Sequence, residues 1–506
     1  MVAVNHSAGV QLAVWLATRH LLPRTRNLSP ITDHLSQPSA VMLCGRESMV
    51  TRALELPSRS DLAAMFRLAL PVVVVQVGMM LMGVVDTMVV GRVSAEALAA
   101  VALGNLAVMA VSAFAIGLLL ALDPVVAQAV GAGDEAAVRR AVQRGLLLAA
   151  AVTVPATLLL LPVEPVLTLL RQPRGTVPIA AGYVHRCLPG LLFFFGFVVL
   201  RQTLQAHERM RPIVTVIVAA NLLNLVLDLV MVFGLLGLPA MGAFGAAWAT
   251  TVCRIVLFVG LLVAARRELM PLLSAVDREA LQLRPLVAMA RIGAPIGIQI
   301  QLELAAFGVI GLLMGGLGTI EMAAHQVAIN IASLTFMVPL GVAAAAAVRV
   351  GHAVGRSDVH EARRAAASAL VCGVGFMACT ALLFLGLPRA LAGAYTSDLE
   401  VVALAAALIP IAGVFQVFDG VQVVSSGILR GLGDTRAPMV VNVLGFWLVG
   451  MPVSVWLAFP LGLGPRGLWW GLVAGLAAVA VLLLLRISRR LSRPMARVVV
   501  DEPSVG

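Results

Sequence analysis

The stretch AVGAGDEAAVRRA, residues 129–141, returns 224 positions later as AVGRSDVHEARRA, residues 353–365. At the same offset, Pro71 matches Pro295. Landmarks that keep a constant spacing over so long a span indicate an internal repeat, in which one structural unit occurs twice. The chain of 506 residues is therefore predicted to consist of two related halves.

The chain is too apolar to be a soluble protein. Hydrophobic residues make up 60% of it and charged residues only 12%, whereas soluble domains carry about 25% charged residues. Its apolar runs are each near or above the roughly 20 residues that a helix needs to cross a bilayer, and none alternates as a barrel strand would. Twelve runs occupy residues 64–90, 97–122, 145–162, 178–200, 212–234, 242–265, 286–314, 321–348, 366–387, 400–425, 438–460 and 465–486.

The sequence thus predicts an all-α polytopic membrane protein with six helices in each half. Six is an even number, so both halves have the same orientation and form two parallel-repeat six-helix bundles. We expect an N-terminal lobe at residues 61–265, a cytoplasmic linker at 266–285 and a C-terminal lobe at 286–487. The more polar residues 1–60 are predicted to be a disordered extension, and residues 488–506 a basic tail.

The arginines predict the orientation in the membrane, since all 36 basic residues are arginines. If both termini are cytoplasmic, about sixteen arginines lie in cytoplasmic loops and about five in the opposite loops, as the positive-inside rule requires. The net charge of +11 does not indicate nucleic-acid binding, because there is no basic stripe with interleaved aromatic residues. The five cysteines show no CxxC pair, so neither a disulfide framework nor a zinc site is predicted.

Polar residues inside the predicted spans are candidates for function, because an ionisable side chain there costs about 2.5–3.5 kcal/mol. The first half has Asp86 in its first helix, and Asn221, Asn224 and Asp228 on one face of its fifth helix. Such a face offers the oxygen ligands that a proton or a hard cation such as Na⁺ needs. The alternative role is an interhelical hydrogen-bond cluster that holds the helices together.

The second half has a comparable set of polar residues. Gln299 and Glu303 lie one turn apart in its first helix. A polar face within an apolar helix indicates that the face lines a cavity. The fourth helix of this half has such a face, formed by Phe415, Asp419, Gln422 and Ser426.

Five stretches carry a resemblance to a known family. They are PVVVVQVGMMLMGVVDTMVVG (71–91), NLLNLVLD (221–228), GAAWAT (245–250), AAHQVAINIASLTFMVPLGVAAAAAVRVGHAVG (323–355) and FDGVQVVSSGILRGLGDTRAP (418–438). Together they resemble the multidrug and toxic compound extrusion (MATE) family, especially its NorM-like branch, over essentially all of residues 62–487. The resemblance implies a V-shaped pair of six-helix bundles and cation-coupled efflux of drugs.

The resemblance also implies a cation or proton site in the first lobe. Asp86 matches the acid of the family's VDT motif, Asn224 and Asp228 match its N-x3-D pair, and Thr250 matches the threonine after GAA.

In the second lobe, the family's acids match Glu303 and Asp419. Some sodium-coupled members have a tyrosine one turn before the latter acid, where this chain has Phe415. This departure removes a hydroxyl ligand and leaves H⁺ and Na⁺ both open as the coupling ion.

We therefore expect a monomeric antiporter in the bacterial inner membrane. H⁺ or Na⁺ would move inward while a lipophilic, cationic compound moves out, with no other cofactor. Pro71 is predicted to be a bending point of the first helix near Asp86.

Two alternatives remain: another membrane transporter, and a protein of a different class, a membrane enzyme. A flippase for a lipid-linked sugar would need a cationic cavity, whereas the charges within the spans are mostly acidic. A membrane-embedded enzyme would need a catalytic motif, and the chain has neither HExxH nor GxSxG.

Overall fold

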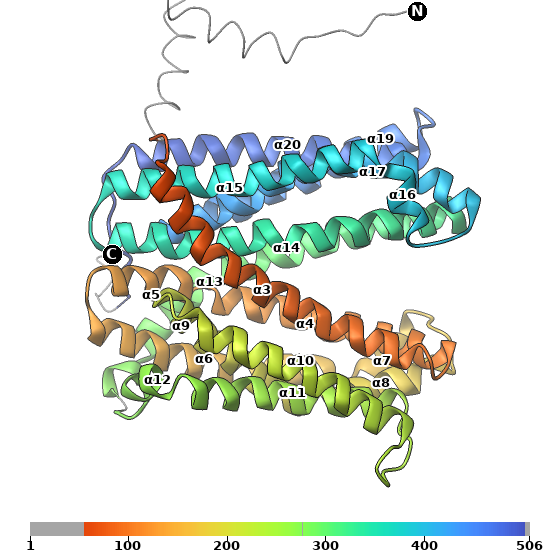
Figure 1. Cartoon of the computed structure of the whole chain (residues 1–506), viewed down its shortest axis with the longest axis horizontal. Coiled ribbons are helices and arrows are strands. Elements are labelled where there is room, and N and C mark those ends of the chain that lie inside the picture. The colour runs from red at the N-terminus through yellow and green to blue at the C-terminus, as the bar shows by residue number, and fades with distance from the viewer. Residues whose placement is uncertain (1–54, 276, 501–506) are drawn as a thin grey trace, which may run out of the picture. The chain divides into compact units, whose positions relative to one another are not determined.

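The computed structural model describes residues 55–275 and 277–500, and every regular element in these two ranges is a helix. Two short elements, α12 (Arg266–Leu273) and η1 (Arg278–Leu281), connect the two halves along the chain, and α12 lies beside α6 and α11 (Figure 1). The first half contains α3 (Arg59–Val90), α4 (Ala95–Leu119), α5 (Leu122–Gly131), α6 (Glu135–Leu160), α7 (Val163–Leu169), α8 (Thr176–Cys187), α9 (Pro189–Ala206), α10 (Met210–Phe233) and α11 (Ala243–Ala264). The second half contains α13 (Leu283–Leu317), α14 (Thr319–Gly355), α15 (Val359–Gly386), α16 (Pro388–Gly393), α17 (Leu399–Gly431), α18 (Arg436–Asn442), the π-helix η2 (Val443–Gly450), α19 (Met451–Ala458) and α20 (Gly464–Leu491).

Within the described residues, twelve helical stretches are long and apolar enough to cross a membrane. One of them joins α4 and α5 as Ala95–Gly131, and another joins α18, η2 and α19 as Arg436–Ala458. Large apolar side chains point outward along these stretches; Leu158 is 61% exposed and Leu312 is 77% exposed. A lipid solvent accepts such a surface because these side chains are apolar, and because the backbone N–H and C=O groups in the interior of a helix bond to one another. The predicted all-helical polytopic fold is confirmed.

Several predicted helix limits differ from the structure; α6, for example, begins at Glu135 and not at residue 145. Two other differences have a clear local cause. The run 178–200 is divided between α8 and α9, which begins at Pro189, because proline lacks the N–H that an interior helical position must donate. α3 begins at Arg59, inside the segment predicted to be an extension, and Ser58 caps it by accepting a hydrogen bond from Asp61 N–H. Residues 1–54 of that predicted extension lie outside the described residues.

The repeated motif encodes the same helix–turn–helix in both halves. Asp134 Oδ1 accepts a hydrogen bond from Ala137 N–H over 2.9 Å, and Asp358 Oδ1 accepts one from Glu361 N–H over 2.9 Å. Each aspartate thereby caps the helix that follows it. The residue before each aspartate has a left-handed backbone, which Gly133 adopts without strain at φ 69°.

The two halves come into close backbone contact where α5 crosses α14. A side chain on Gly131 would collide with the carbonyl oxygen of His352, and one on Gly355 would collide with that of Gln128. Gly131 and Gly355 occupy the same position in the two repeats. The paired glycines therefore let two backbones pass in contact at the junction of the halves.

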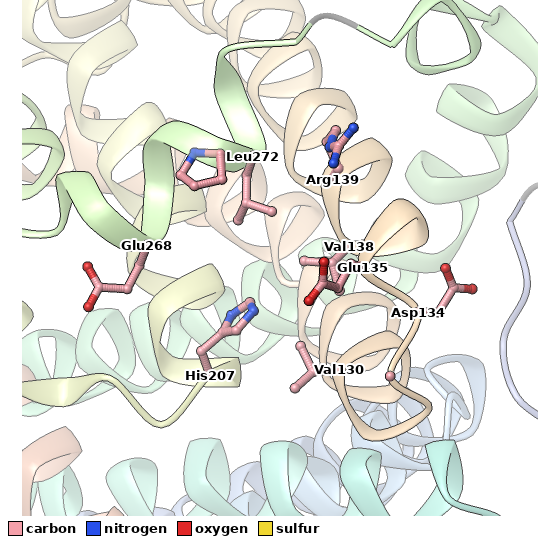
Figure 2. Close-up of a pocket in the computed structure, with 10 residues that line it drawn as sticks. Val130, Asp134, Glu135, Val138, Arg139, His207, Glu268 and Leu272 are labelled. Carbon is pink, nitrogen blue, oxygen red and sulfur yellow. The ribbon is translucent and has the colours of Figure 1, made fainter.

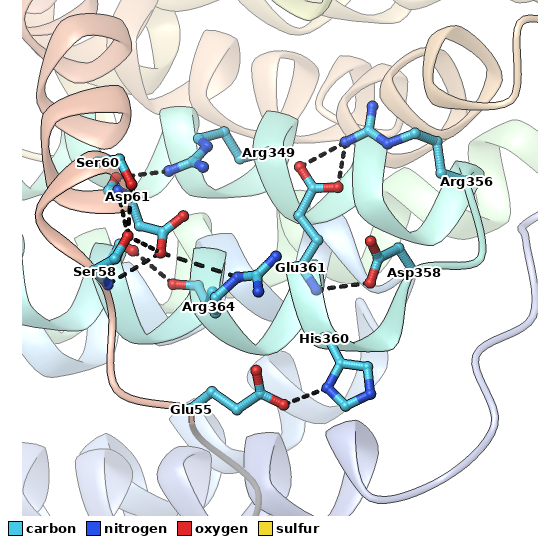
Figure 3. A network of polar contacts seen from close by, with 11 residues as sticks. Glu55, Ser58, Ser60, Asp61, Arg349, Arg356, Asp358, His360, Glu361 and Arg364 are labelled. Carbon is cyan, nitrogen blue, oxygen red and sulfur yellow. Dashed lines mark hydrogen bonds and ion pairs between the residues drawn. The ribbon is translucent and has the colours of Figure 1, made fainter.

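The start of α3 is fastened to the second half by polar contacts, although α3 also packs along α10 of the first half (Figure 3). Arg349 Nη1 of α14 donates to the Asp61 carbonyl oxygen over 3.0 Å. Glu55, just before α3, pairs with His360 of α15 at 2.5 Å. α3 is thus held by both halves.

The linker between the halves is fastened to α6. Gln143 Nε2 donates to the carbonyl oxygens of Leu272 and Ala275 over 2.9 and 2.7 Å, and Gln143 Oε1 accepts from Asp277 N–H. Arg140 Nη1 lies 3.4 Å from a carboxylate oxygen of Glu279. These contacts attach the linker to the first half. We call the end of the bundle where α12 and the repeated turns lie the linker face (Figure 1).

Candidate functional site

Three helices bring the polar residues of the first half together around Asp86 of α3. Asn224 of α10 donates from Nδ2 to Asp86 Oδ1 over 2.9 Å, and Thr250 of α11 donates from Oγ1 to Asp86 Oδ2 over 2.9 Å. Asp86 is 2% exposed and Asn224 is fully buried. Both oxygens of the carboxylate therefore accept a hydrogen bond within an apolar helix bundle. The family resemblance implied one site for these three residues, and the structure brings their side chains into contact.

Asp228 lies beside Asp86 but is bonded differently. It is fully buried, and neither of its carboxylate oxygens has a hydrogen-bond donor among the described residues. The two carboxyl groups are close enough for one to donate to the other when either carries a proton. Two adjacent buried carboxylates cannot both remain charged without a cation between them or a proton on one. The pair is therefore chemically suited to take up one positive charge.

The structure adds one residue to this site and removes another. Asn221, predicted on the same face of α10, instead donates to the Ile217 carbonyl oxygen one turn back. Tyr183 of α8 is fully buried, lies beside Thr250, and donates its hydroxyl to Asn105 Oδ1 over 3.0 Å. It is one of only two tyrosines in the chain, which was the signal in the sequence that could have marked it.

The second half forms its polar site between α13 and α17. Gln422 Nε2 donates to Glu303 Oε2 over 3.3 Å, and Gln299 Nε2 lies 3.4 Å from Ser426 Oγ. Asp419 is 6% exposed, lies within electrostatic range of Glu303, and has one buried oxygen, Oδ1, without a partner among the described residues. The predicted residues thus converge here as well, with two acids facing one region.

Phe415 belongs to an aromatic cluster next to this second site. Its ring meets Phe307 edge-to-face at 6.0 Å between centroids and Trp469 at 5.7 Å. Phe415 is 2% exposed, so it fills the core beside Asp419. The cluster places flat apolar surfaces close to the acids of the second half.

The two sites are not copies of each other. Ile310 occupies in the second repeat the position that Asp86 occupies in the first, and it is fully buried. Met79 occupies in the first repeat the position of Glu303. The repeat therefore provides a common framework, while each half carries its own chemistry.

A cavity of about 330 Å³ lies on the linker face (Figure 2). None of the predicted site residues lines it. Its polar lining combines two basic side chains, Arg139 and His207, with three carboxylates, those of Asp134, Glu135 and Glu268.

Comparison with known proteins agrees with this arrangement. The MatE family model matches residues 71–230 and 295–456, one match in each half. The chain is 38% identical over 447 residues to the probable multidrug resistance protein NorM of Rhizobium meliloti (strain 1021), covering 85% of this chain and 93% of that protein. It is 37% identical over 443 residues to the multidrug resistance protein NorM of Burkholderia vietnamiensis, covering 85% and 94%.

Solved structures show the same fold. The crystal structure of the eukaryotic MATE transporter AtDTX14 matches with a TM-score of 0.78 at 24% identity, over 86% of this chain and 98% of that one. The Vibrio cholerae MATE transporter VcmN in its bent form matches with a TM-score of 0.76 at 21% identity, over 86% and 97%. The matches confirm the predicted family and exclude the membrane-enzyme alternative, since the family is one of transporters. The chain belongs to the MATE family, as a multi-pass membrane protein homologous to bacterial NorM.

Proposed function

We propose that this protein is an antiporter that exports lipophilic, cationic compounds in exchange for H⁺ or Na⁺. Its relatives from Rhizobium meliloti and Burkholderia vietnamiensis are named as multidrug resistance proteins, which supports drugs as the substrate class. The same relatives give no support to the alternative of a lipid-linked sugar flippase.

The buried pair of Asp86 and Asp228 is the observation that carries the proposal. Asp86 is fully bonded by Asn224 and Thr250, whereas Asp228 has no donor among the described residues. One added cation, either a proton shared between the carboxyls or a sodium ion held by the surrounding oxygens, would satisfy the pair. Binding and release of that cation is the chemical step that an ion gradient can drive.

The second polar site is the proposed contact for the substrate. Glu303 and Asp419 provide two carboxyl groups, which carry negative charge once they release their protons, and Phe415 with its aromatic neighbours provides flat apolar surface. A lipophilic cation needs both, since it must be desolvated and also neutralised. Gln299, which is hydrogen-bonded to Ser426, would contribute a polar side chain to the edge of this site.

Alternating access would arise from movement of the N-terminal lobe, residues 61–265, against the C-terminal lobe, residues 286–487. Pro71 is the proposed bending point of α3, which both halves hold. The linker at residues 266–285 and both termini would face the cytoplasm of a bacterium, with the protein in the inner membrane. A single chain supplies all residues of both sites, which supports a monomer as the working unit.

Efflux from proteoliposomes tests the proposal. The purified protein is reconstituted, a fluorescent lipophilic cation is loaded, and either a pH or a Na⁺ gradient is imposed. Export driven by one of the two gradients, and abolished by Asp228→Asn, is the expected result. An export rate that is the same with and without either gradient would contradict an antiporter.

A further inference from the structure

The described part of the tail after α20, residues 492–500, reaches from the second half to the first. Residues 492–500 contain no helix or strand. Arg497 Nη2 lies 3.0 Å from Asp134 Oδ2, and Val498 N–H donates to Gln128 Oε1 over 2.7 Å. Gln128 and Asp134 both belong to the first half, on the linker face. The tail therefore spans the junction between the halves.

Gln128 of α5 is the point where the tail and α17 are joined to the first half. It is fully buried, and its Nε2 donates to the carbonyl oxygen of Gly431, the last residue of α17, over 2.8 Å. Its Oε1 accepts from Val498 N–H. One buried amide thus satisfies a helix-end carbonyl and a tail N–H of the second half together. Separating the halves here would leave buried polar groups without partners.

Apolar and ionic contacts extend this attachment. The Val498 side chain lies over Gly433, whose φ of 75° and missing side chain make room for it. Val498 and Val500 also pack against the buried apolar residues of the first half. The Ala137 N–H and the Arg497 guanidinium hold the pKa of the Asp134 carboxyl below its usual range, so Asp134 is charged at neutral pH. In Figure 2 the Asp134 carboxylate points away from His207 and Glu268, toward the tail.

The same junction is closed by contacts beneath the tail. Arg430 at the end of α17 lies 3.8 Å from Asp123 of α5, and both side chains are largely buried. His352 of α14 is within 2.8 Å of the Ala206 carbonyl oxygen at the end of α9. The linker face is therefore shut in this structure, and the tail lies across the closed junction.

We propose that residues 495–500 form a strap that holds the two halves closed at the linker face and is released when the transporter opens on that side. The inference rests on the proposed alternating access, because only a protein that opens and closes has use for such a strap. A contact that exists only in the closed state stabilises that state, and the equilibrium moves toward it by the free energy of the contact. The strap favours the state closed at the linker face.

Distance measurements on the full-length protein test the strap. Spin labels are placed at Ala136→Cys and Ser357→Cys, two exposed positions in equivalent turns of the two halves, in a background without native cysteines. A tail truncated after Arg493 should raise the population of long distances about tenfold, equivalent to about 1.4 kcal/mol. Because truncation can also lower the yield of folded protein, Arg497→Ala with Val498→Pro removes the ion pair and the N–H donor from an intact chain. This double variant should raise the population of long distances as much as the truncation does.

Arg493→Ala is the matched control. It removes one positive charge from the exposed part of the tail, where the structure records no side-chain contact, and should leave the distances unchanged. If the tail only stabilises the fold, both tail variants should lower thermal stability and leave the distances between the spin labels unchanged. That outcome overturns the proposal. The distances do not depend on transport. A shift without any gradient-driven export would refute the antiporter and retain the strap.

Discussion

Replacing Asp228 with Asn should abolish gradient-driven efflux without weakening the fold. In the structure Asp228 is fully buried and has no donor among the described residues, so the substitution breaks no hydrogen bond. It replaces one of two adjacent carboxyls with an amide, which can donate to Asp86. Hydrogen bonds between helices in membranes average about 0.6 kcal/mol, with a maximum near 1.7 kcal/mol. We expect stability to be unchanged or raised by about that amount, since a buried charge is also removed.

Asp86→Asn should also lose transport, but at a measurable cost in stability. Two donors, Asn224 Nδ2 and Thr250 Oγ1, bond to the Asp86 carboxylate. An amide offers one acceptor oxygen where the carboxylate offered two, so one buried donor must find a new arrangement or remain unpaired. An unpaired buried donor costs about 1–3 kcal/mol. Asp228→Asn should therefore be more stable than Asp86→Asn by about 1 kcal/mol or more.

Two assays check this pair of variants: thermal unfolding of the purified proteins and efflux from proteoliposomes under the driving gradient. Asn221→Ala is the control and should retain efflux, because among the described residues the Asn221 side chain bonds only to its own helix. Near-normal efflux in both aspartate variants would refute the first-half site and shift attention to Glu303 and Asp419. A loss of about 3–5 kcal/mol in Asp228→Asn would mean that its charge is paired and structural.

Three further outcomes are expected. A cysteine at Leu463 should react with an impermeant thiol reagent outside intact cells and one at Ser357 should not; the opposite labelling would reverse the proposed orientation. Gly355→Ala should lower thermal stability by about 1–3 kcal/mol, because the new methyl group meets the Gln128 carbonyl oxygen, and an unchanged melting temperature would show that the crossing relaxes freely. Deleting residues 1–48, which lie outside the described residues, should preserve membrane insertion and efflux because the segment is too polar to pack in lipid, and loss of folded protein would contradict this.

The sequence alone was enough to predict the membrane-spanning helices and to single out most residues of the candidate site. Lipid offers the backbone no hydrogen bonds, so each long apolar run had to be a helix, and the repeat showed that the halves share one orientation. Asp86, Asn224 and Asp228 stood out because polar groups are costly inside a membrane span and must have a use there. The free-energy cost of placing a polar side chain in a membrane span depends on the residue type. It can therefore be estimated from the sequence without knowing which residues lie nearby.

Which polar groups meet was decided only by tertiary structure. Asn221 and Asn224 share a helical face, yet only Asn224 reaches Asp86, because contact depends on how α10 is rotated against α3. The bonds to Asp86 join residues 138 and 164 positions apart in the chain, and no local pattern predicts such a pairing. The tail shows the same limit: composition marked it as basic, but its attachment to Gln128 exists only where α5, α17 and Val498 come together.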